Sequence, residues 1–93
     1  MLVKLTGRYI ETTSVEYITR VYSKPNTNPT SYGFDVYFKG REKHFECRYE
    51  IKQYTAETKD SLLKKIENIR TKLAKKVSPE EIETLDSLID LKK

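Results

Sequence analysis

The chain has 93 residues, a formal net charge of +4 and 34 % charged residues. A chain of this length forms one small domain, in which a deep, enclosed active-site cavity would be costly, so we expect no enzyme. A lone cysteine excludes an internal disulfide, and no apolar run reaches the roughly 18 residues of a membrane span. These totals predict a single domain over 1–93, located in the cytoplasm and not bound to a membrane.

The aromatic residues divide the chain into two parts. All seven Tyr and three Phe fall between Tyr9 and Tyr54. Aromatic and β-branched residues favour strands, whereas the Leu, Ile, Lys and Glu that dominate the remainder favour helices. The sequence therefore predicts an α+β fold, with an antiparallel sheet of about four strands over 1–55 and a helical hairpin over 56–93.

The first part of the sheet consists of short extended segments. Residues 3–5 and 8–11 are separated by a turn at Gly7, and a longer strand follows over 15–23. Two registers stay open for that strand. In one, the odd-numbered residues from Val15 to Val21 face the core; in the other, a bulge turns Ile18 inward.

The next hairpin has the clearest alternation of the chain. It follows a segment over 24–31 that is rich in proline and asparagine and predicts a mobile loop. A four-residue loop over 39–42 would join two strands whose alternate residues are apolar. This register predicts three cross-strand pairs: Phe34 with Cys47, Val36 with Phe45, and Tyr37 with His44.

The helical part shows two amphipathic segments. The first, over 57–77, has one apolar stripe, made by Leu62, Ile66, Ile69, Leu73 and Val77. Ser78, Pro79 and Glu81 predict the start of a second helix, which runs to about Leu91. We expect its inward face to hold Ile82, Leu85, Leu88 and Ile89. The first helix is basic and the second acidic, so an antiparallel pair would be electrostatically matched.

No residue pattern predicts catalysis, a metal site or a cofactor. His44 and Cys47 are three residues apart in a strand and therefore point to opposite faces, so they cannot act together as nucleophile and base or as metal ligands. The strand pattern places no pair of carboxylates in an apolar setting, and the three glycines are too scattered for a phosphate-binding loop.

Two surfaces are candidates for binding. The first is the open face of the hairpin, which mixes aromatic and basic residues: Arg20, Tyr22, Tyr37, Lys39, Arg41, Lys43, His44 and Arg48. Sheet faces of this type stack nucleic-acid bases on aromatic rings, although Asp35, Glu46 and Glu50 on the same side would repel phosphate. The second is the lysine side of the first helix: Lys64, Lys65, Lys72, Lys75 and Lys76. Lysine-rich helix faces are most often simply solvated.

The opening run Lys-Leu-Thr-Gly-Arg-Tyr-Ile over 4–10, followed by Val-Glu-Tyr-Ile over 15–18, resembles short bacterial and phage-borne proteins with the layout of the flagellar FlbD-like family. The resemblance implies an N-terminal hairpin, two further strands and a helix, together with a small accessory or regulatory role. It carries over no functional residue. The chain departs from this layout in its proline- and asparagine-rich loop and in its second helix.

Two functional hypotheses follow. The first-ranked is a protein-binding inhibitor or adaptor, such as an anti-defence factor of a phage or mobile element, that uses the helices and the 24–33 loop. The alternative is a nucleic-acid-binding regulator that uses Tyr37, His44 and Arg48 with the neighbouring Lys and Arg. Neither basic surface is dense, which favours the protein partner. An apolar helix stripe that the sheet leaves uncovered could also make a homodimer through knobs-into-holes contacts.

Overall fold

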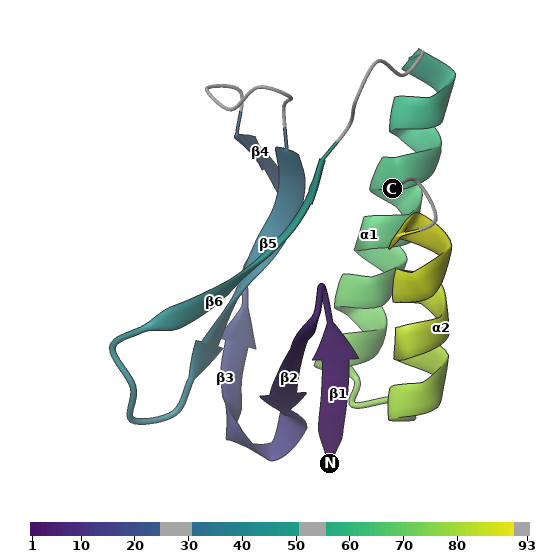
Figure 1. Ribbon diagram of the computed structural model, residues 1–93. Coiled ribbons are helices and arrows are strands. Elements are labelled where there is room, and N and C mark those ends of the chain that lie inside the picture. The colour runs from purple at the N-terminus through teal and green to yellow at the C-terminus, as the bar shows by residue number, and fades with distance from the viewer. Residues whose placement is uncertain (25–30, 51–55, 91–93) are drawn as a thin grey trace.

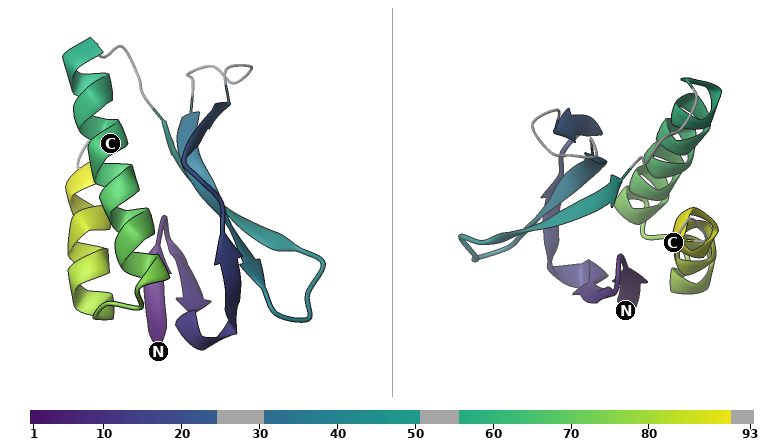
Figure 2. Two further views of the ribbon diagram at one scale, coloured as in Figure 1. Left: turned by 180° about the vertical axis from the view of Figure 1, so that it is seen from behind. Right: turned by 45° about the horizontal axis from the view of Figure 1, so that its top comes forward.

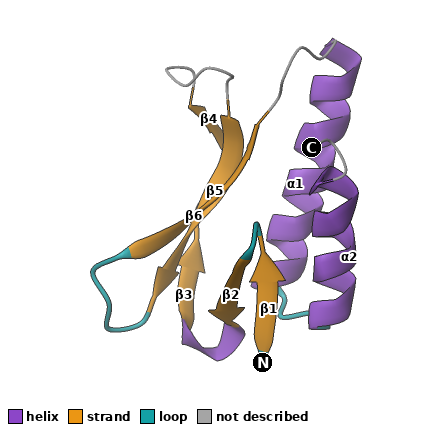
Figure 3. Ribbon diagram, in the orientation of Figure 1, coloured by secondary structure: helices purple, strands orange, loops and turns teal. Residues whose placement is uncertain are grey.

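The structure is a computed structural model that describes residues 1–24, 31–50 and 56–90 (Figure 1). It confirms the α+β fold with strands first and two helices last (Figure 3). The elements, in chain order, are β1 (Leu2–Leu5), β2 (Arg8–Glu11), a 3-10 turn (Thr12–Ser14), β3 (Val15–Ile18), β4 (Tyr22–Lys24), β5 (Ser31–Phe38), β6 (His44–Glu50), α1 (Ala56–Ala74) and α2 (Pro79–Asp90). No helix within the described ranges is long and apolar enough to cross a membrane.

The strands form two antiparallel sheets. β1 and β2 make a hairpin, and β3 to β6 make a four-stranded sheet around β5. β6 pairs with β5 along residues 31–37, so β3 and β4 share the opposite edge of β5. Lys24 and Ser31 pair with each other in this sheet, so the predicted loop is shorter at both ends than 24–31. Its central residues, 25–30, lie outside the described residues.

The strand expected over 15–23 is interrupted by two irregularities. Val15 pairs with Phe38, but Tyr17 pairs with Tyr37, which places a bulge at Glu16. The register shifts once more before β4. Ile18 is buried and Tyr17 is 52 % exposed, so the second of the two open registers is the one that forms.

The β5–β6 hairpin has the predicted register, including all three predicted cross-strand pairs. The side chains of Phe34, Val36 and Cys47 are fully buried, and that of Phe45 is nearly so. Gly33 leaves no room for a side chain against β6, because a Cβ atom placed there would be 1.8 Å from the carbonyl oxygen of Cys47.

The turn of the β1–β2 hairpin has two residues with positive φ, Thr6 at 48° and Gly7 at 85°. This is the pattern of a type I′ turn, whose twist matches the twist of the flanking strands. Two backbone amides on the outer edge of β1 then donate to carboxylates of α2: Lys4 N to Glu83 Oε2 at 3.1 Å, and Thr6 N to Asp86 Oδ2 at 3.3 Å. The second helix therefore covers the free edge of β1.

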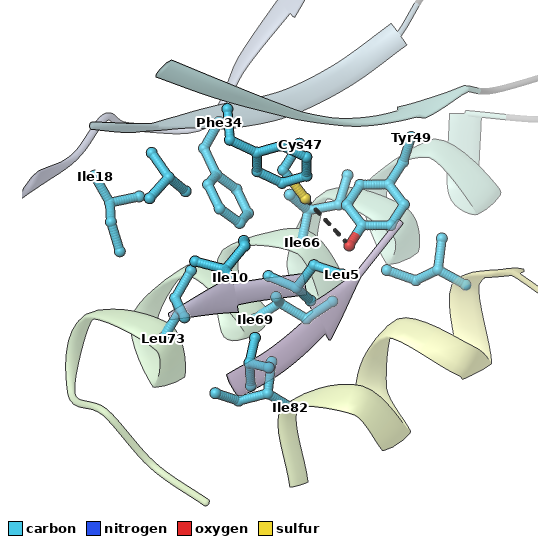
Figure 4. Close-up of a cluster of buried hydrophobic side chains, with 14 of the residues drawn as sticks. Leu5, Ile10, Ile18, Phe34, Cys47, Tyr49, Ile66, Ile69, Leu73 and Ile82 are labelled. Atoms are coloured by element: carbon cyan, nitrogen blue, oxygen red, sulfur yellow. Dashed lines mark hydrogen bonds between the residues drawn. The ribbon is translucent and has the colours of Figure 1, made fainter. Parts of the chain in front are cut away.

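The core lies between the four-stranded sheet on one side and the helices and the β1–β2 hairpin on the other (Figures 1 and 2). α1 packs against β3 and β5, whereas α2 packs against β1 and α1. Figure 4 shows side chains from all these layers meeting. Neither α1 nor α2 lies over the opposite face of the sheet (Figure 2).

The predicted apolar stripe of α1 is buried from Leu62 to Leu73, and Val77 beyond the helix is partly buried. The prediction for α2 is wrong at one position. Leu88 is 48 % exposed, whereas Asp86 is buried between Ile82 and Ile89. The helix is turned so that this carboxyl accepts hydrogen bonds from the β1–β2 turn and from β6.

The first helix ends in a Schellman motif on a non-glycine residue. Val77 N donates to Lys72 O, and Lys76 N donates to Leu73 O, both at 3.1 Å. Lys76 has a φ of 55°, which is the left-handed position that such a motif requires and that usually holds glycine.

Substituting Lys76→Gly should raise the free energy of unfolding by about 1 kcal/mol, because glycine adopts positive φ without the Cβ strain of lysine. Lys64→Gly is the control, because it makes the same exchange in the interior of the same helix. Glycine is unfavourable there, so this variant should lower the free energy of unfolding by about 1 kcal/mol. Urea denaturation of the two variants measures both values. A loss of stability in Lys76→Gly would contradict the assigned motif.

Candidate functional site

Three stacked rings cross the open face of the four-stranded sheet. Tyr17 of β3 stacks on Tyr37 of β5 with ring centroids 4.6 Å apart and planes at 5°. Tyr37 stacks in turn on His44 of β6, with centroids 4.9 Å apart and planes at 18°. The rings come from directly paired positions on three adjacent strands, so the strand register sets the stack.

The stack determines which parts of the rings meet a partner. Its centroid spacing is close to the separation of neighbouring strands, about 4.8 Å. The rings therefore stand upright on the sheet and face one another along the direction from strand to strand. They present edges and hydroxyl groups outward, whereas the inner ring faces are covered by their neighbours.

A network of charged side chains lies beside the stack, at the β4 end of the face. Tyr22 Oη lies 2.8 Å from both carboxylate oxygens of Asp35 and donates its one proton to this carboxylate. Arg48 Nη2 is 3.3 Å from Asp35 Oδ1 and 3.5 Å from Glu46 Oε1, and it also donates to Tyr22 Oη. The Arg48 guanidinium lies 4.5 Å from the centre of the Tyr22 ring. This network ties β4, β5 and β6 together.

Asp35 is held in place by the irregularity between β3 and β4. Thr19 N donates to Asp35 O at 2.9 Å, and Asp35 N donates to Thr19 Oγ1 at 2.9 Å. Where the register shifts, the Asp35 amide therefore donates to the Thr19 hydroxyl in place of a backbone carbonyl of the neighbouring strand. The bulged edge keeps its hydrogen bonds, and the carboxylate of Asp35 is fixed on the open face.

The surroundings favour the neutral form of the Tyr22 and Tyr37 phenols and the charged form of the Glu46 carboxylate. Burial, followed by the hydrogen bond to Asp35, raises the pKa of Tyr22. Desolvation, followed by the proximity of Tyr17 and Asp35, raises the pKa of Tyr37. Desolvation would raise the pKa of Glu46 as well, but the charges of Lys24 and Arg48 outweigh it and lower the pKa.

Asp35, His44 and Glu46 are the one group on this face whose ligand atoms are close enough for a metal ion, all within 4.8 Å of one another among the described residues. Arg48 already provides a positive charge to both carboxylates, and Lys24 Nζ lies 3.5 Å from Glu46 Oε1. A divalent cation would compete with these two cations. The group is therefore best explained as an ion-pair network.

The structure divides the predicted sheet-face residues into two kinds. Tyr37, His44, Tyr22 and Arg48 lie together in the stack and the network. The basic residues at the edges point to solvent and are exposed, namely Arg20, Lys39, Arg41 and Lys43. Arg48 Nη2 and Tyr22 Oη contact Asp35, and Nε and Nη1 of Arg48 are buried, so neither side chain is available to bind phosphate.

The predicted lysine face of α1 is mostly solvated. Lys64, Lys65, Lys75 and Lys76 are exposed, and Lys72 pairs with Glu81 of α2 at 2.7 Å. That contact is one instance of the expected match between a basic and an acidic helix. Exposed pairs of this kind contribute only about 0.2–1 kcal/mol.

Two features of the site differ from what the sequence pattern predicts: the position of Tyr17 and the pairing of Asp35. The sequence pattern allows the Tyr17 side chain to lie on either face of the sheet, and only the bulge at Glu16 places it beside Tyr37. Asp35 was expected as a repulsive surface acid, but it is buried and paired. The predicted pairing of Tyr37 with His44 already places Asp35 opposite Glu46, with Arg48 as a near neighbour on the same face, so the network could have been inferred from it.

The opposite orientations of His44 and Cys47 are as predicted: the imidazole is exposed and the thiol is fully buried. Burial raises the pKa of the Cys47 thiol to about 12. The thiol is therefore protonated and shielded at neutral pH, and it cannot act as a nucleophile.

The native protein should not react measurably with an aromatic disulfide reagent at pH 8 within an hour, because the reactive thiolate is both scarce and covered. One equivalent should react within minutes in 6 M guanidinium, which serves as the control. Absorbance of the released thiolate measures both. Rapid reaction of the folded chain would contradict the buried position of Cys47.

No protein-family model, curated protein sequence or solved structure matches this chain. The resemblance of the opening residues to the FlbD-like layout therefore stays a prediction.

Proposed function

We propose that this chain is a non-catalytic protein-binding module, an inhibitor or adaptor, that contacts its partner through the open face of the β3–β6 sheet. The observation that carries the proposal is the row of upright rings, Tyr17, Tyr37 and His44, on a sheet face that neither α1 nor α2 covers. Tyrosine and arginine are enriched among the residues that dominate the affinity of protein interfaces.

The orientation of the rings favours a protein over a nucleic acid. Bases bind to sheet surfaces by stacking on ring faces that lie flat and open. The inner faces here are covered by neighbouring rings at 4.6 and 4.9 Å. The exposed edges and the phenol hydroxyls suit apolar contacts and hydrogen bonds with side chains and backbone of another protein.

Preorganisation supports the same proposal. Stacking holds the rings, and the Asp35, Tyr22 and Arg48 network holds the strands beneath them. A surface that is already ordered loses little side-chain entropy when it binds, so more of the contact energy appears as affinity.

Affinity retention from cell extract tests the proposal. The immobilised wild type should retain a partner that Tyr17→Ala/Tyr37→Ala does not retain. The matched control, Leu88→Ser, removes an exposed apolar side chain from α2 and should retain the partner. If no protein distinguishes the wild type from the double variant, the open face is not the binding surface.

A nucleic-acid regulator is the second candidate, favoured by one observation. The loop between β5 and β6 carries Lys39, Arg41 and Lys43, all exposed, next to the His44 end of the stack. Affinity for a labelled 20-nucleotide single strand, measured from 50 to 300 mM salt, tests this candidate. Phosphate contacts predict a steep loss of affinity with salt that Lys39→Glu/Lys43→Glu abolishes. Absence of binding at 50 mM salt rejects it.

A further inference from the structure

The outer edge of β6 has its backbone groups directed away from the sheet. Both backbone groups of Asp35 bond to Thr19 on the β3 side, so the pair Asp35–Glu46 exchanges no hydrogen bonds across β5 and β6. The backbone N–H and C=O of Glu46 therefore point away from β5. The same alternation directs those of His44 and Arg48 outward as well.

Two other sheet edges are protected, in contrast to this one. The edge made by β3 and β4 is broken by two register shifts, which discourage pairing with another strand. The outer edge of β1 is covered by α2 through Glu83 and Asp86. β6 runs for seven residues with a continuous register, and within the described part of the chain it pairs only with β5.

An open groove of about 590 Å³ follows this edge and ends at the tip of the β1–β2 hairpin. It is lined by Thr6 and Arg8 from the hairpin and by residues 43–46 and Arg48 from the β6 side. The Arg8 guanidinium lies 5.9 Å from the centre of the Phe45 ring. Arg48 and Glu46 of the groove lining pair with each other, so Arg8 and Lys43 leave the groove with a positive charge that favours an acidic occupant.

We propose that the outer edge of β6 binds an extended, acidic segment of the partner protein by adding it as a further strand. A second copy of this chain fits less well. In such a pair, β6 of the second copy would lie along the edge. The apolar side chains of that strand, Phe45, Cys47 and Tyr49, are buried in the core of the second copy and cannot fill the groove of the first. A free segment has side chains available for the groove, and its acids would meet Arg8 and Lys43.

This inference rests on the proposed protein-binding function, and it names the backbone edge at which the partner is held. Hydrogen–deuterium exchange of the free protein tests its first step. The amides of 44, 46 and 48 should exchange rapidly, whereas those of 45, 47 and 49 should be protected by β5. Protection of 46 that increases with protein concentration, together with a mass of about twice 11.0 kDa by light scattering, would show a second copy at the edge and overturn the proposal.

Selection of random nine-residue peptides displayed on phage tests the second step. Clones enriched on the wild type should be rich in Asp and Glu and should slow exchange at 46. Glu46→Pro removes one outward N–H without removing a bond to β5, so it should weaken these peptides at least tenfold. Glu46→Gln keeps the N–H and removes the one acid of the groove, so this matched control should bind the acidic peptides at least as tightly as the wild type.

Arg8→Glu provides a readout that does not depend on how well the edge tolerates proline. It should also weaken the acidic clones at least tenfold, whereas Lys64→Glu on α1 should leave them unchanged. If no clones are enriched, or if both Glu46→Pro and Arg8→Glu leave binding intact, the edge is not the site. A partner lost with Tyr17→Ala/Tyr37→Ala but retained by Glu46→Pro would preserve the proposed function and reject the edge alone.

Discussion

Substituting Gly33→Ala should lower the free energy of unfolding by about 3 kcal/mol or more, because overpacking where no atom can move aside is among the most destabilising changes. The added methyl would lie 1.8 Å from the carbonyl oxygen of Cys47 and 3.1 Å from Cα of Arg48. Both are backbone atoms of the paired strand, so relief requires β5 and β6 to separate. Urea denaturation followed by circular dichroism measures the loss.

Gly40→Ala is the matched control for this substitution. A Cβ at Gly40 meets nothing within 4 Å, but its φ of 68° strains any side chain. The expected cost is about 1 kcal/mol from backbone strain alone. If the two variants were equally stable, the close approach of β5 and β6 at Gly33 would be wrong.

The second large effect is expected at a buried hydrogen-bond network that links α2 to both sheets. Tyr49 of β6 donates its phenol proton to Asp86 Oδ1, and Thr6 N of the hairpin turn donates to Asp86 Oδ2. Cys47 Sγ lies 3.5 Å from Tyr49 Oη (Figure 4). Burial raises the pKa of Tyr49, which keeps the phenol protonated as a donor.

Tyr49→Phe should cost about 2 kcal/mol, because it removes a donor from a buried carboxyl. Asp86→Ala should cost about 3 kcal/mol or more, since it leaves two donors unsatisfied and opens a cavity. The double variant Tyr49→Phe/Asp86→Leu replaces both polar groups and should recover part of the loss. Strictly additive costs, measured by chemical denaturation, would show that the two side chains do not interact in the native state.

Much of the fold follows from local patterns in the sequence. The alternation of Phe34 and Val36 with polar residues determined the register of β5 and β6, because a shift by one residue would have exposed both. The stripe from Leu62 to Leu73 predicted the buried face of α1. In both cases only one register or helix orientation buries all the apolar side chains of the element.

The remaining features depend on tertiary contacts that no local pattern encodes. Tyr17 faces outward because of a bulge whose position is set by pairing with β5, a partner some twenty residues later. Asp86 replaces Leu88 on the inner face of α2 because Tyr49 and the turn amide of Thr6 supply donors there. A helix pattern alone favours the leucine.

The candidate site was predicted in part for the same reason. His44 and Tyr37 were placed together by the hairpin register, whereas their stack with Tyr17 required the bulge. Arg48 was identified as a surface cation. Its engagement by Asp35 and Glu46 changes that role, because a paired guanidinium stabilises the sheet face and is not free to recruit phosphate.

The most direct test of the proposed binding face is the dissociation constant of the partner recovered by affinity retention, measured by calorimetry for the wild type and for Tyr17→Ala. Removing an exposed ring at the end of the stack should weaken binding at least tenfold, as expected for a residue that dominates an interface, while leaving the melting temperature within a few degrees of the wild type. An unchanged dissociation constant in a folded Tyr17→Ala variant would contradict the role assigned to the open sheet face.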